Sequence, residues 1–339
     1  MSTLSTAKGY LGKPRLRHCT FVIRNDKESI FLVFGKDYFE IGKDVGDPRK
    51  FMELKRYMDG RHTIPQIAEH TGVNEESVRD IVAMMDEMGM FREELPLDRI
   101  KKEDFLRAID DTAVMWSRQI GYHQLFAGLE RNEYPKEVFH GLLLETYQYV
   151  KSATRHISNA LAHCRDEHHE KILTDYFLDE YNHTDLILQT LENVGIPREV
   201  AQTANPLVGT TALIQMLCEI GRQSSLAYIA CTSLFEARQE DYATAQASFE
   251  KISGNFGHIP DTIEPILQHM RGDIEGGHQS LIERALEHVE YIEAKEAHFV
   301  INCVHDLKHA FDLYHDNIIS YYNDPASYIP RLYVDYFSL

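Results

Sequence analysis

The sequence predicts two folded parts of different class: a small α+β module of the winged-helix type, followed by an all-α bundle of seven or eight helices. Two observations carry this prediction. Near the start of the chain, short runs of β-branched and aromatic residues alternate with polar turns, as in antiparallel strands. From about residue 100 onward, the apolar residues follow helical spacing and the strand pattern does not return.

The composition disfavours several classes of protein. The formal net charge of −18 opposes nucleic-acid binding by the chain as a whole, because phosphate contacts require an excess of Lys and Arg. No apolar run approaches the roughly 20 residues that span a bilayer, and the start of the chain lacks the apolar core of a signal peptide, so we expect a cytoplasmic protein. The five cysteines include no Cys-x-x-Cys pair, which argues against a disulfide framework and a thiolate zinc site.

The first module is expected to span residues 18–95, after a flexible arm at residues 1–17. Its predicted strands form an antiparallel meander at residues 20–24, 29–34 and 38–41. Three short helices follow, each bounded by capping residues or a closing glycine, at residues 49–58, 63–72 and 74–89. A charged segment with a proline, residues 93–98, marks the boundary with the bundle.

One stretch of this module is distinctive. It reads YMDGRHTIPQIA at residues 57–68, and is followed by Val78 to Met85 and by EMGM at residues 87–90. This pattern resembles the PqqD-like RiPP recognition element over residues 18–95. The resemblance implies binding of a precursor-peptide leader as an added strand at the sheet edge, beside the third helix.

Two other interpretations of the module are open. The winged-helix fold could serve dimerisation alone. A DNA-reading version fits less well, because the third helix carries five acidic residues against the single basic residue Arg79.

The second part is expected to span residues 100–339. Its helices are predicted at residues 103–130, 136–164, 167–194, 210–238, 242–252, 259–271 and 281–323, the last in one or two pieces. Glycine, proline and asparagine punctuate the segments between them, as in an antiparallel bundle.

Acidic and histidine residues recur on these helices beside apolar neighbours. Glu145 follows three leucines, and a buried carboxylate there needs a partner. Carboxylates and imidazoles from several helices are typical of sites that bind two iron or manganese ions in a bundle core. Each residue taken singly is more often solvated, so the prediction rests on the joint spacing. The remaining members are the Glu180-x2-His183 pair, Glu236, and the His269-x3-Asp273 pair.

Over about residues 103–300, this set resembles the heme-oxygenase-like diiron oxidase and oxygenase superfamily. The resemblance implies a seven-helix bundle that binds two iron ions, with manganese as a variant, and uses dioxygen as co-substrate. It implies as ligands Glu145, Glu180, His183, Glu236, His269 and Asp273.

One position departs from the pattern of that family, which places a further His three residues after the Asp. This chain has Gly276 there, and the nearest imidazole is His278, five residues after Asp273. His278 would lie off the helical face unless Gly276 and Gly277 unwind the helix. We therefore predict His278 as a further ligand, with Glu275 as the substitute.

Other groups of histidines have competing interpretations. His305, His309, Asp312 and His315 share one helical stripe, which suits a metal site, a layer behind the ligands, or a partly exposed polar face. His163, His168 and His169 lie in or beside a charged run that is typical of a solvated turn. No glycine-rich phosphate loop follows a strand, which disfavours nucleotide use.

These observations predict a dioxygen-dependent diiron enzyme that oxidises a peptide or a peptide-borne amino acid in natural-product biosynthesis, acting as a homodimer. Two alternatives stay open. The bundle could oxidise, N-oxygenate or cleave a free or carrier-bound amino acid. The chain could also be a non-catalytic peptide chaperone or adaptor. Catalytic residues beyond the metal ligands are not predicted.

Overall fold

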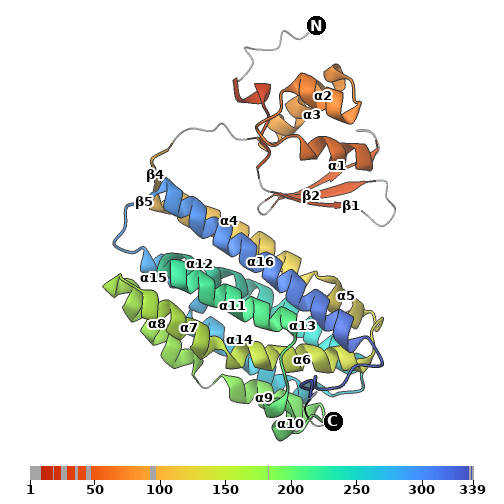
Figure 1. Cartoon of the computed structure of the whole chain (residues 1–339), viewed down its shortest axis with the longest axis vertical. Coiled ribbons are helices and arrows are strands. Elements are labelled where there is room, and N and C mark those ends of the chain that lie inside the picture. Colours follow the sequence, from red (N-terminus) through yellow and green to blue (C-terminus); the bar gives the residue numbers. More distant parts are fainter. Residues whose placement is uncertain are drawn as a thin grey trace. The chain divides into compact units, whose positions relative to one another are not determined.

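The computed structural model describes residues 9–17, 19–23, 29–34, 37–42, 47–91, 97–181, 183–335 and 337. The chain divides into two compact units, residues 1–97 and 98–339 (Figure 1). The boundary segment predicted at residues 93–98 lies outside the described residues up to residue 96. No helix among the described residues is both long and apolar enough to cross a membrane.

The first unit contains the predicted meander. Strands β1 (Thr20–Ile23), β2 (Ile30–Phe34) and β3 (Asp37–Ile41) pair antiparallel in the order β1-β2-β3, with Phe21 opposite Leu32 and Leu32 opposite Phe39. The turns between these strands lie outside the described residues.

The three helices of this unit begin and end near the residues predicted to cap them. They are α1 (Pro48–Arg56), α2 (Ile64–Thr71) and α3 (Glu75–Glu87). The side chain of Asn74 accepts a hydrogen bond from the backbone N–H of Ser77 at 2.8 Å, and Gly72 ends α2 with a φ of 66°. Their apolar faces share one core, which includes Leu32, Leu54, Ile67, Val82 and Met85.

The beginning of the described chain differs from the predicted flexible arm. Residues 9–12 form a short 3₁₀ helix, η1 (Gly9–Gly12). The Leu16 N–H donates to the Met58 carbonyl at 3.1 Å, and the Arg17 N–H donates to the Met90 carbonyl at 2.9 Å. These main-chain bonds hold residues 16 and 17 against the unit, so the predicted arm is too long. Residues 1–8 lie outside the described part of the chain.

The second unit is helical, as predicted, but most of the long predicted helices are broken into two. The first four pairs are α4 (Lys102–Gly121) and α5 (Gln124–Glu130), α6 (Lys136–Lys151) and α7 (Ala153–His163), α8 (Glu167–Glu180) and α9 (Thr184–Asn193), and α11 (Val208–Gln223) and α12 (Ser225–Phe235). The other helices are α10 (Arg198–Thr203), α13 (Gln239–Asn255), α14 (Glu264–Gly276), α15 (Leu281–Ala285) and α16 (Ala294–Tyr322).

Helix α12 runs through the middle of this bundle. All its residues from Leu226 to Leu234 are buried, and it packs against α4, α11, α15 and α16 (Figure 1). A helix that is apolar on all sides requires neighbours on all sides, and the surrounding helices provide them. Two short strands, β4 (Arg99–Lys101) and β5 (Tyr291–Glu293), pair antiparallel and join the start of α4 to the start of α16.

Candidate metal centre

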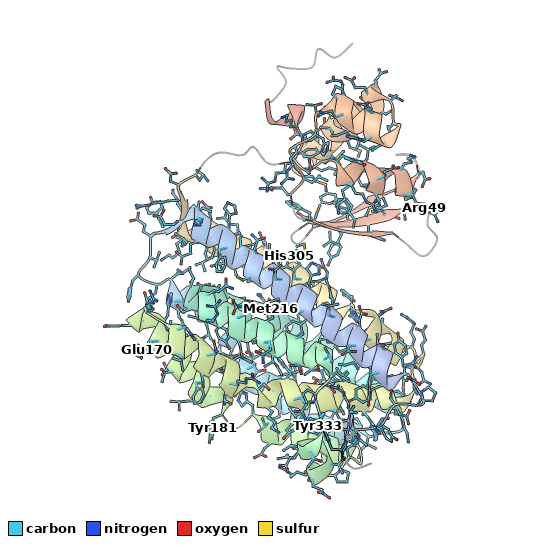
Figure 2. All side chains as sticks on the ribbon, viewed as in Figure 1. Arg49, Glu170, Tyr181, Met216, His305 and Tyr333 are labelled. Carbon is cyan, nitrogen blue, oxygen red and sulfur yellow. The ribbon has the colours of Figure 1, made fainter. Side chains whose placement is uncertain are left out.

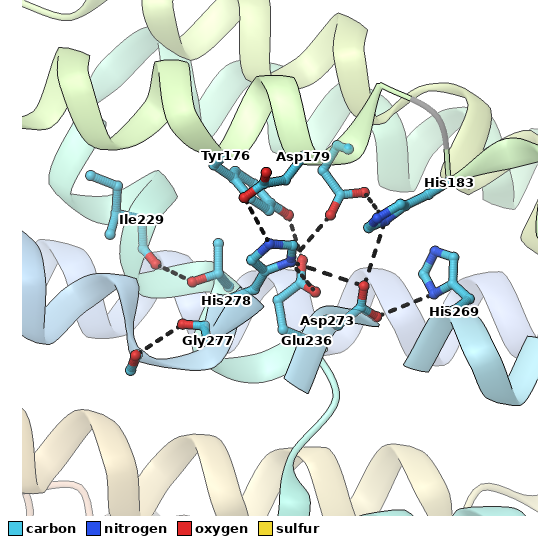
Figure 3. A network of polar contacts seen from close by, with 12 residues as sticks. Tyr176, Asp179, His183, Ile229, Glu236, His269, Asp273, Gly277 and His278 are labelled. Carbon is cyan, nitrogen blue, oxygen red and sulfur yellow. Dashed lines mark hydrogen bonds and ion pairs between the residues drawn. The ribbon is translucent and has the colours of Figure 1, made fainter. Parts of the chain in front are cut away.

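Six of the seven predicted ligands meet inside the bundle (Figure 3). Most of them lie at or just beyond the ends of helices, and only His269 and Asp273 lie within one. Glu180 is the last residue of α8, His183 caps the start of α9, and Glu236 follows the end of α12. His269 and Asp273 lie on α14, and His278 begins the short 3₁₀ helix η4 (His278–Ser280).

The first group of donors contains one carboxylate and two imidazoles: Glu180, His183 and His269. His183 Nδ1 lies 3.2 Å from Glu180 Oε2. His269 Nδ1 lies 3.2 Å from Asp273 Oδ2, so Asp273 also borders this group. The two imidazole rings meet edge to face, with their centroids 4.9 Å apart.

The second group contains Glu180, Glu236, Asp273 and His278, all buried. His278 Nδ1 lies 3.2 Å from Glu180 Oε1 and 3.5 Å from Glu236 Oε2. Glu180 therefore directs Oε2 towards His183 of the first group and Oε1 towards His278 of the second. Asp273 Oδ1 likewise lies 3.6 Å from His183 Nδ1 and 3.9 Å from His278 Nδ1. Two carboxylates thus lie between the groups.

The break after α14 brings His278 into this cluster. Gly277 adopts a left-handed conformation with a φ of 67°, which ends the helix and turns the following residue back towards its axis. A Cβ atom at Gly276 would lie 2.6 Å from His278 Nε2, so the absent side chain leaves room for the imidazole. Glu275, the predicted substitute, is exposed.

The Glu180 and His183 pair reaches the site differently from the prediction, which placed both on one face of a continuous helix. Helix α8 ends at Glu180 and α9 begins at Thr184, and Asn182 between them lies outside the described residues. The two residues still meet: the His183 N–H donates to the Glu180 carbonyl at 3.4 Å, and the two side chains lie 3.2 Å apart.

The donor atoms of the cluster are suited to a metal ion rather than to one another. In the described part of the chain, Glu180 Oε1, His183 Nδ1, His269 Nε2, Asp273 Oδ1 and both His278 nitrogens are buried without a hydrogen-bond partner. Several lie within 4 Å of each other, yet without the directions of hydrogen bonds. Buried polar atoms are rarely left in this state, and metal coordination would satisfy them.

The electrostatics of the cluster agree with this interpretation. Burial, followed by the charge of Asp273, raises the pKa of Glu236. Burial opposes the charge on His278, but contacts with Glu180 and Glu236 outweigh it and raise the pKa of His278. Without a metal, a protonated His278 therefore balances part of the negative charge, in the position that a cation would take.

Two residues beside the ligands were not predicted from the sequence. The Tyr176 hydroxyl donates a hydrogen bond to Glu236 Oε1, and its ring meets the His278 ring edge to face at 4.9 Å. Asp179 Oδ2 lies 3.6 Å from His278 Nε2, on the side of the ring away from Glu180. One signal was present: Tyr176 precedes Glu180 by one helical turn and so shares its face.

Glu145, the seventh predicted ligand, lies elsewhere in the bundle. Its Oε2 accepts a 3.0 Å hydrogen bond from the Leu207 N–H and another from the Thr210 hydroxyl, and its Oε1 accepts one from Tyr322 at 2.9 Å. The Tyr322 ring lies over Gly141, where a Cβ would come within 2.2 Å of it. Glu145 is buried and partnered, as expected, but its partners are hydrogen-bond donors.

The histidines described on α16, among them His305 (labelled in Figure 2), belong to none of the groups of donors in the core cluster. His305 Nε2 and His309 Nε2 lie 3.2 Å apart, whereas His315 is buried beside the rings of His123 and Phe126. Asp312 is paired with Lys308, so its carboxylate already has a cation. Within the described residues, this stripe offers no group of three converging donors.

Comparison with known proteins supports the fold of the second unit. Residues 110–255 match the model of the TENA/THI-4/PQQC family, which covers less than half of the chain. A structure from Shewanella denitrificans OS217, described as a domain of unknown function with a heme oxygenase-like fold, superposes with a TM-score of 0.54. That alignment has 16% identity and covers 66% of this chain and 94% of the other.

The helical unit has a heme-oxygenase-like fold. Less similar is a TenA homolog from Pseudomonas syringae pv. tomato, with a TM-score of 0.48 and 12% identity over 64% of this chain and 93% of that one. No match was found among curated proteins. The buried cluster of acidic and histidine residues in this unit is a candidate metal site.

Proposed function

We propose that this chain is a non-heme diiron oxidoreductase that uses dioxygen to oxidise a peptide side chain or a peptide-borne amino acid. The observation that carries the proposal is the position of Glu180, which belongs to two adjacent groups of metal donors inside a helical bundle. Carboxylates between two ions, with imidazoles at each end, are a common way for bundles to hold two iron or manganese ions. When bound, two ferrous ions supply electrons for the reduction of dioxygen.

The residues divide naturally between two ions. His183, His269 and Glu180 would hold one, and His278, Glu236 and Glu180 the other. Asp273 borders both and would complete either. The three carboxylates together balance most of the positive charge of two divalent ions, and the three imidazoles are neutral. A single divalent ion would leave part of the negative charge of the carboxylates uncompensated.

The neighbouring side chains hold the ligands in position. The Tyr176 hydroxyl fixes the Glu236 carboxylate, and Asp179 faces the outer nitrogen of His278. A carboxylate behind a coordinating histidine orients the ring and selects the tautomer with a free inner nitrogen. Burial of Glu180 and His278, at 5% and 2% exposure, keeps water away from the inner ligands.

The peptide part of the proposal rests on the first unit. Strand β3 lies at one edge of the sheet, since among the described residues it pairs only with β2. An extended leader peptide could add there as a further strand, with main-chain hydrogen bonds supplying affinity.

Iron loading tests the metal part. Metal-free chain without an affinity tag would be titrated anaerobically with Fe²⁺ and then mixed with oxygenated buffer. We expect uptake of two iron ions and rapid oxygen consumption. Glu180→Gln should reduce both, because it weakens both groups at once, whereas Glu170→Gln on the exposed side of α8 should leave both unchanged. Equal behaviour of the two variants would contradict the proposal. The same titration with Mn²⁺ would show whether the cluster also binds manganese ions.

Leader binding tests the peptide part. A fluorescent precursor leader would be titrated into the full chain and into a chain that begins at residue 98, where the second unit begins. We expect binding only to the full chain. Undiminished binding by the shorter chain would remove the role proposed for the first unit, without affecting the metal centre.

A further inference from the structure

A second group of metal-binding side chains lies away from the core cluster, where the start of α8 meets the segment between α15 and β5. It consists of His168, Glu287 and His288. Glu287 Oε1 lies 3.6 Å from His168 Nε2 and 3.0 Å from His288 Nε2. In a tetrahedral zinc site with bonds of about 2.0–2.1 Å, neighbouring ligand atoms lie about 3.3 Å apart. The two distances to Glu287 therefore lie close to this value, and all three donor atoms lie within 4.8 Å of one another.

The three residues converge from distant parts of the sequence. His168 lies in the first turn of α8, whereas Glu287 and His288 follow the end of α15. The rings of His168 and His288 have their centroids 5.3 Å apart. A single ion here would link two segments of the bundle that no disulfide joins.

The group opens onto a cavity of about 300 Å³. His168 and His288 line it, together with the acidic residues Asp166, Glu293 and Glu296, of which Glu293 also pairs with Arg99. Acidic walls favour a bound cation, and the space admits the water that would fill a remaining coordination position.

One existing hydrogen bond must be exchanged on binding. His168 Nε2 lies 2.8 Å from the carbonyl oxygen of Arg284, to which it donates in the metal-free state. To coordinate through this atom, the neutral ring carries its proton on Nδ1 instead. The Arg284 carbonyl oxygen, freed from the imidazole proton, could then serve as the fourth donor in place of water.

We propose that His168, Glu287 and His288 form a second metal site, which binds one divalent ion of the zinc type. Two imidazoles and one carboxylate are a donor set that suits zinc, in contrast with the carboxylate-rich cluster in the core. The ion links the first turn of α8 to the segment before β5, and stabilises the folded bundle through its binding free energy.

The test is a zinc count on metal-free, untagged full-length chain after equilibrium dialysis against Zn²⁺. The variants are His288→Ala and His168→Ala, with His298→Ala as the matched control, since His298 is an exposed histidine on α16. We expect each of the first two to bind one zinc ion fewer than the wild type, and the control to bind the same number. His288 is 78% exposed at its side chain, so its removal does not endanger folding.

A second variant separates this site from the core cluster. Glu180→Gln should lower metal binding in the core and leave the zinc ion at His168, Glu287 and His288 in place. The double variant Glu180→Gln, His288→Ala should then bind one zinc ion fewer than Glu180→Gln alone. The proposal is overturned if His288→Ala and His298→Ala bind equal amounts of zinc, or if the wild type binds none outside the core.

Discussion

His278 reaches the core cluster because two glycines precede it. Gly277 supplies the left-handed turn, and Gly276 leaves the space that the imidazole occupies. A side chain at either position would displace the ring, since a left-handed conformation is strained for other residues and a Cβ at Gly276 would touch Nε2. Gly276 is therefore a positioning residue for His278 in the proposed metal centre.

Replacing Gly276 with Ala should therefore weaken metal binding. We expect Gly276→Ala to lower the affinity for the second ion by roughly tenfold or more, the range seen when support for a ligand is lost. Competition with a chelator for Mn²⁺ would measure it. Gly272→Ala, on the same helix, is the control, because a Cβ atom at Gly272 would meet no other atom within 4 Å. Similar affinities in both variants would argue against a role for His278.

Asp179 permits a second test at the same ligand. Asp179→Asn keeps the size of the side chain but removes the charge that faces His278 Nε2. We expect a loss of about 10- to 100-fold in metal affinity, as for other carboxylates behind coordinating histidines. Asp175→Asn, one turn earlier on α8, should have no effect. A pair of variants with matching affinities would show that Asp179 does not orient the ring.

The sequence predicted most of the residues that gather in the core cluster, but it did not predict the partners of Glu145. Glu180, Glu236, His269 and Asp273 were selected by residue type, by their joint spacing and by the resemblance that this spacing carries. Glu145 satisfied the same criteria, but its partner Tyr322 lies 177 residues away on α16, and no local pattern indicates that contact. Glu145 is thus separated from the core cluster by a contact between residues far apart in the sequence.

At the scale of helices, the breaks position the site. Helix α12 begins after Ser224, which is extended, with φ −158° and ψ 122°, and whose Oγ accepts a 3.1 Å hydrogen bond from the Ala227 N–H. Apolar periodicity continues across this break and therefore predicts a single helix over residues 210–238, where the structure has α11 and α12. Hydrophobic spacing reports which face is buried, and it is insensitive to a one-residue change of direction.

The cap at Ser224 should contribute measurably to stability. We expect Ser224→Ala to lower the free energy of unfolding by about 0.5–2 kcal/mol, the usual cost of losing an N-cap side chain. Ser158→Ala is the control, since Ser158 is exposed within α7 and its hydroxyl only returns to the Thr154 carbonyl. Urea denaturation of both variants at neutral pH measures the difference, and equal free energies of unfolding would discount the cap.

At the scale of the whole molecule, buried neutral histidines should make the fold sensitive to acid. Burial lowers the pKa of His156 to about 3, and that of His315 to about 3 as well. The unfolded chain takes up these protons near the ordinary histidine pKa of about 6.5. Between about pH 6.5 and 3 the unfolded state therefore binds more protons, and stability falls as the pH falls.

The expected slope is about 1.4 kcal/mol per pH unit for each such histidine. Urea denaturation of metal-free protein at several pH values in this window would measure it. His156→Gln removes one of the two groups, and also its 2.6 Å contact with the Tyr228 hydroxyl, so stability drops but the slope becomes shallower. His163→Gln, on the exposed end of α7, should preserve the slope. A steep slope that survives in His156→Gln would contradict this assignment.

The central claim concerns two ions on either side of Glu180. The most direct measurement is a crystal structure of iron-loaded protein, with an anomalous difference map collected at the iron absorption edge. The account predicts two peaks about 3.5–4 Å apart, one beside His183 and His269 and the other beside His278 and Glu236. A single peak in the bundle core, or iron found only outside it, would contradict a dinuclear centre.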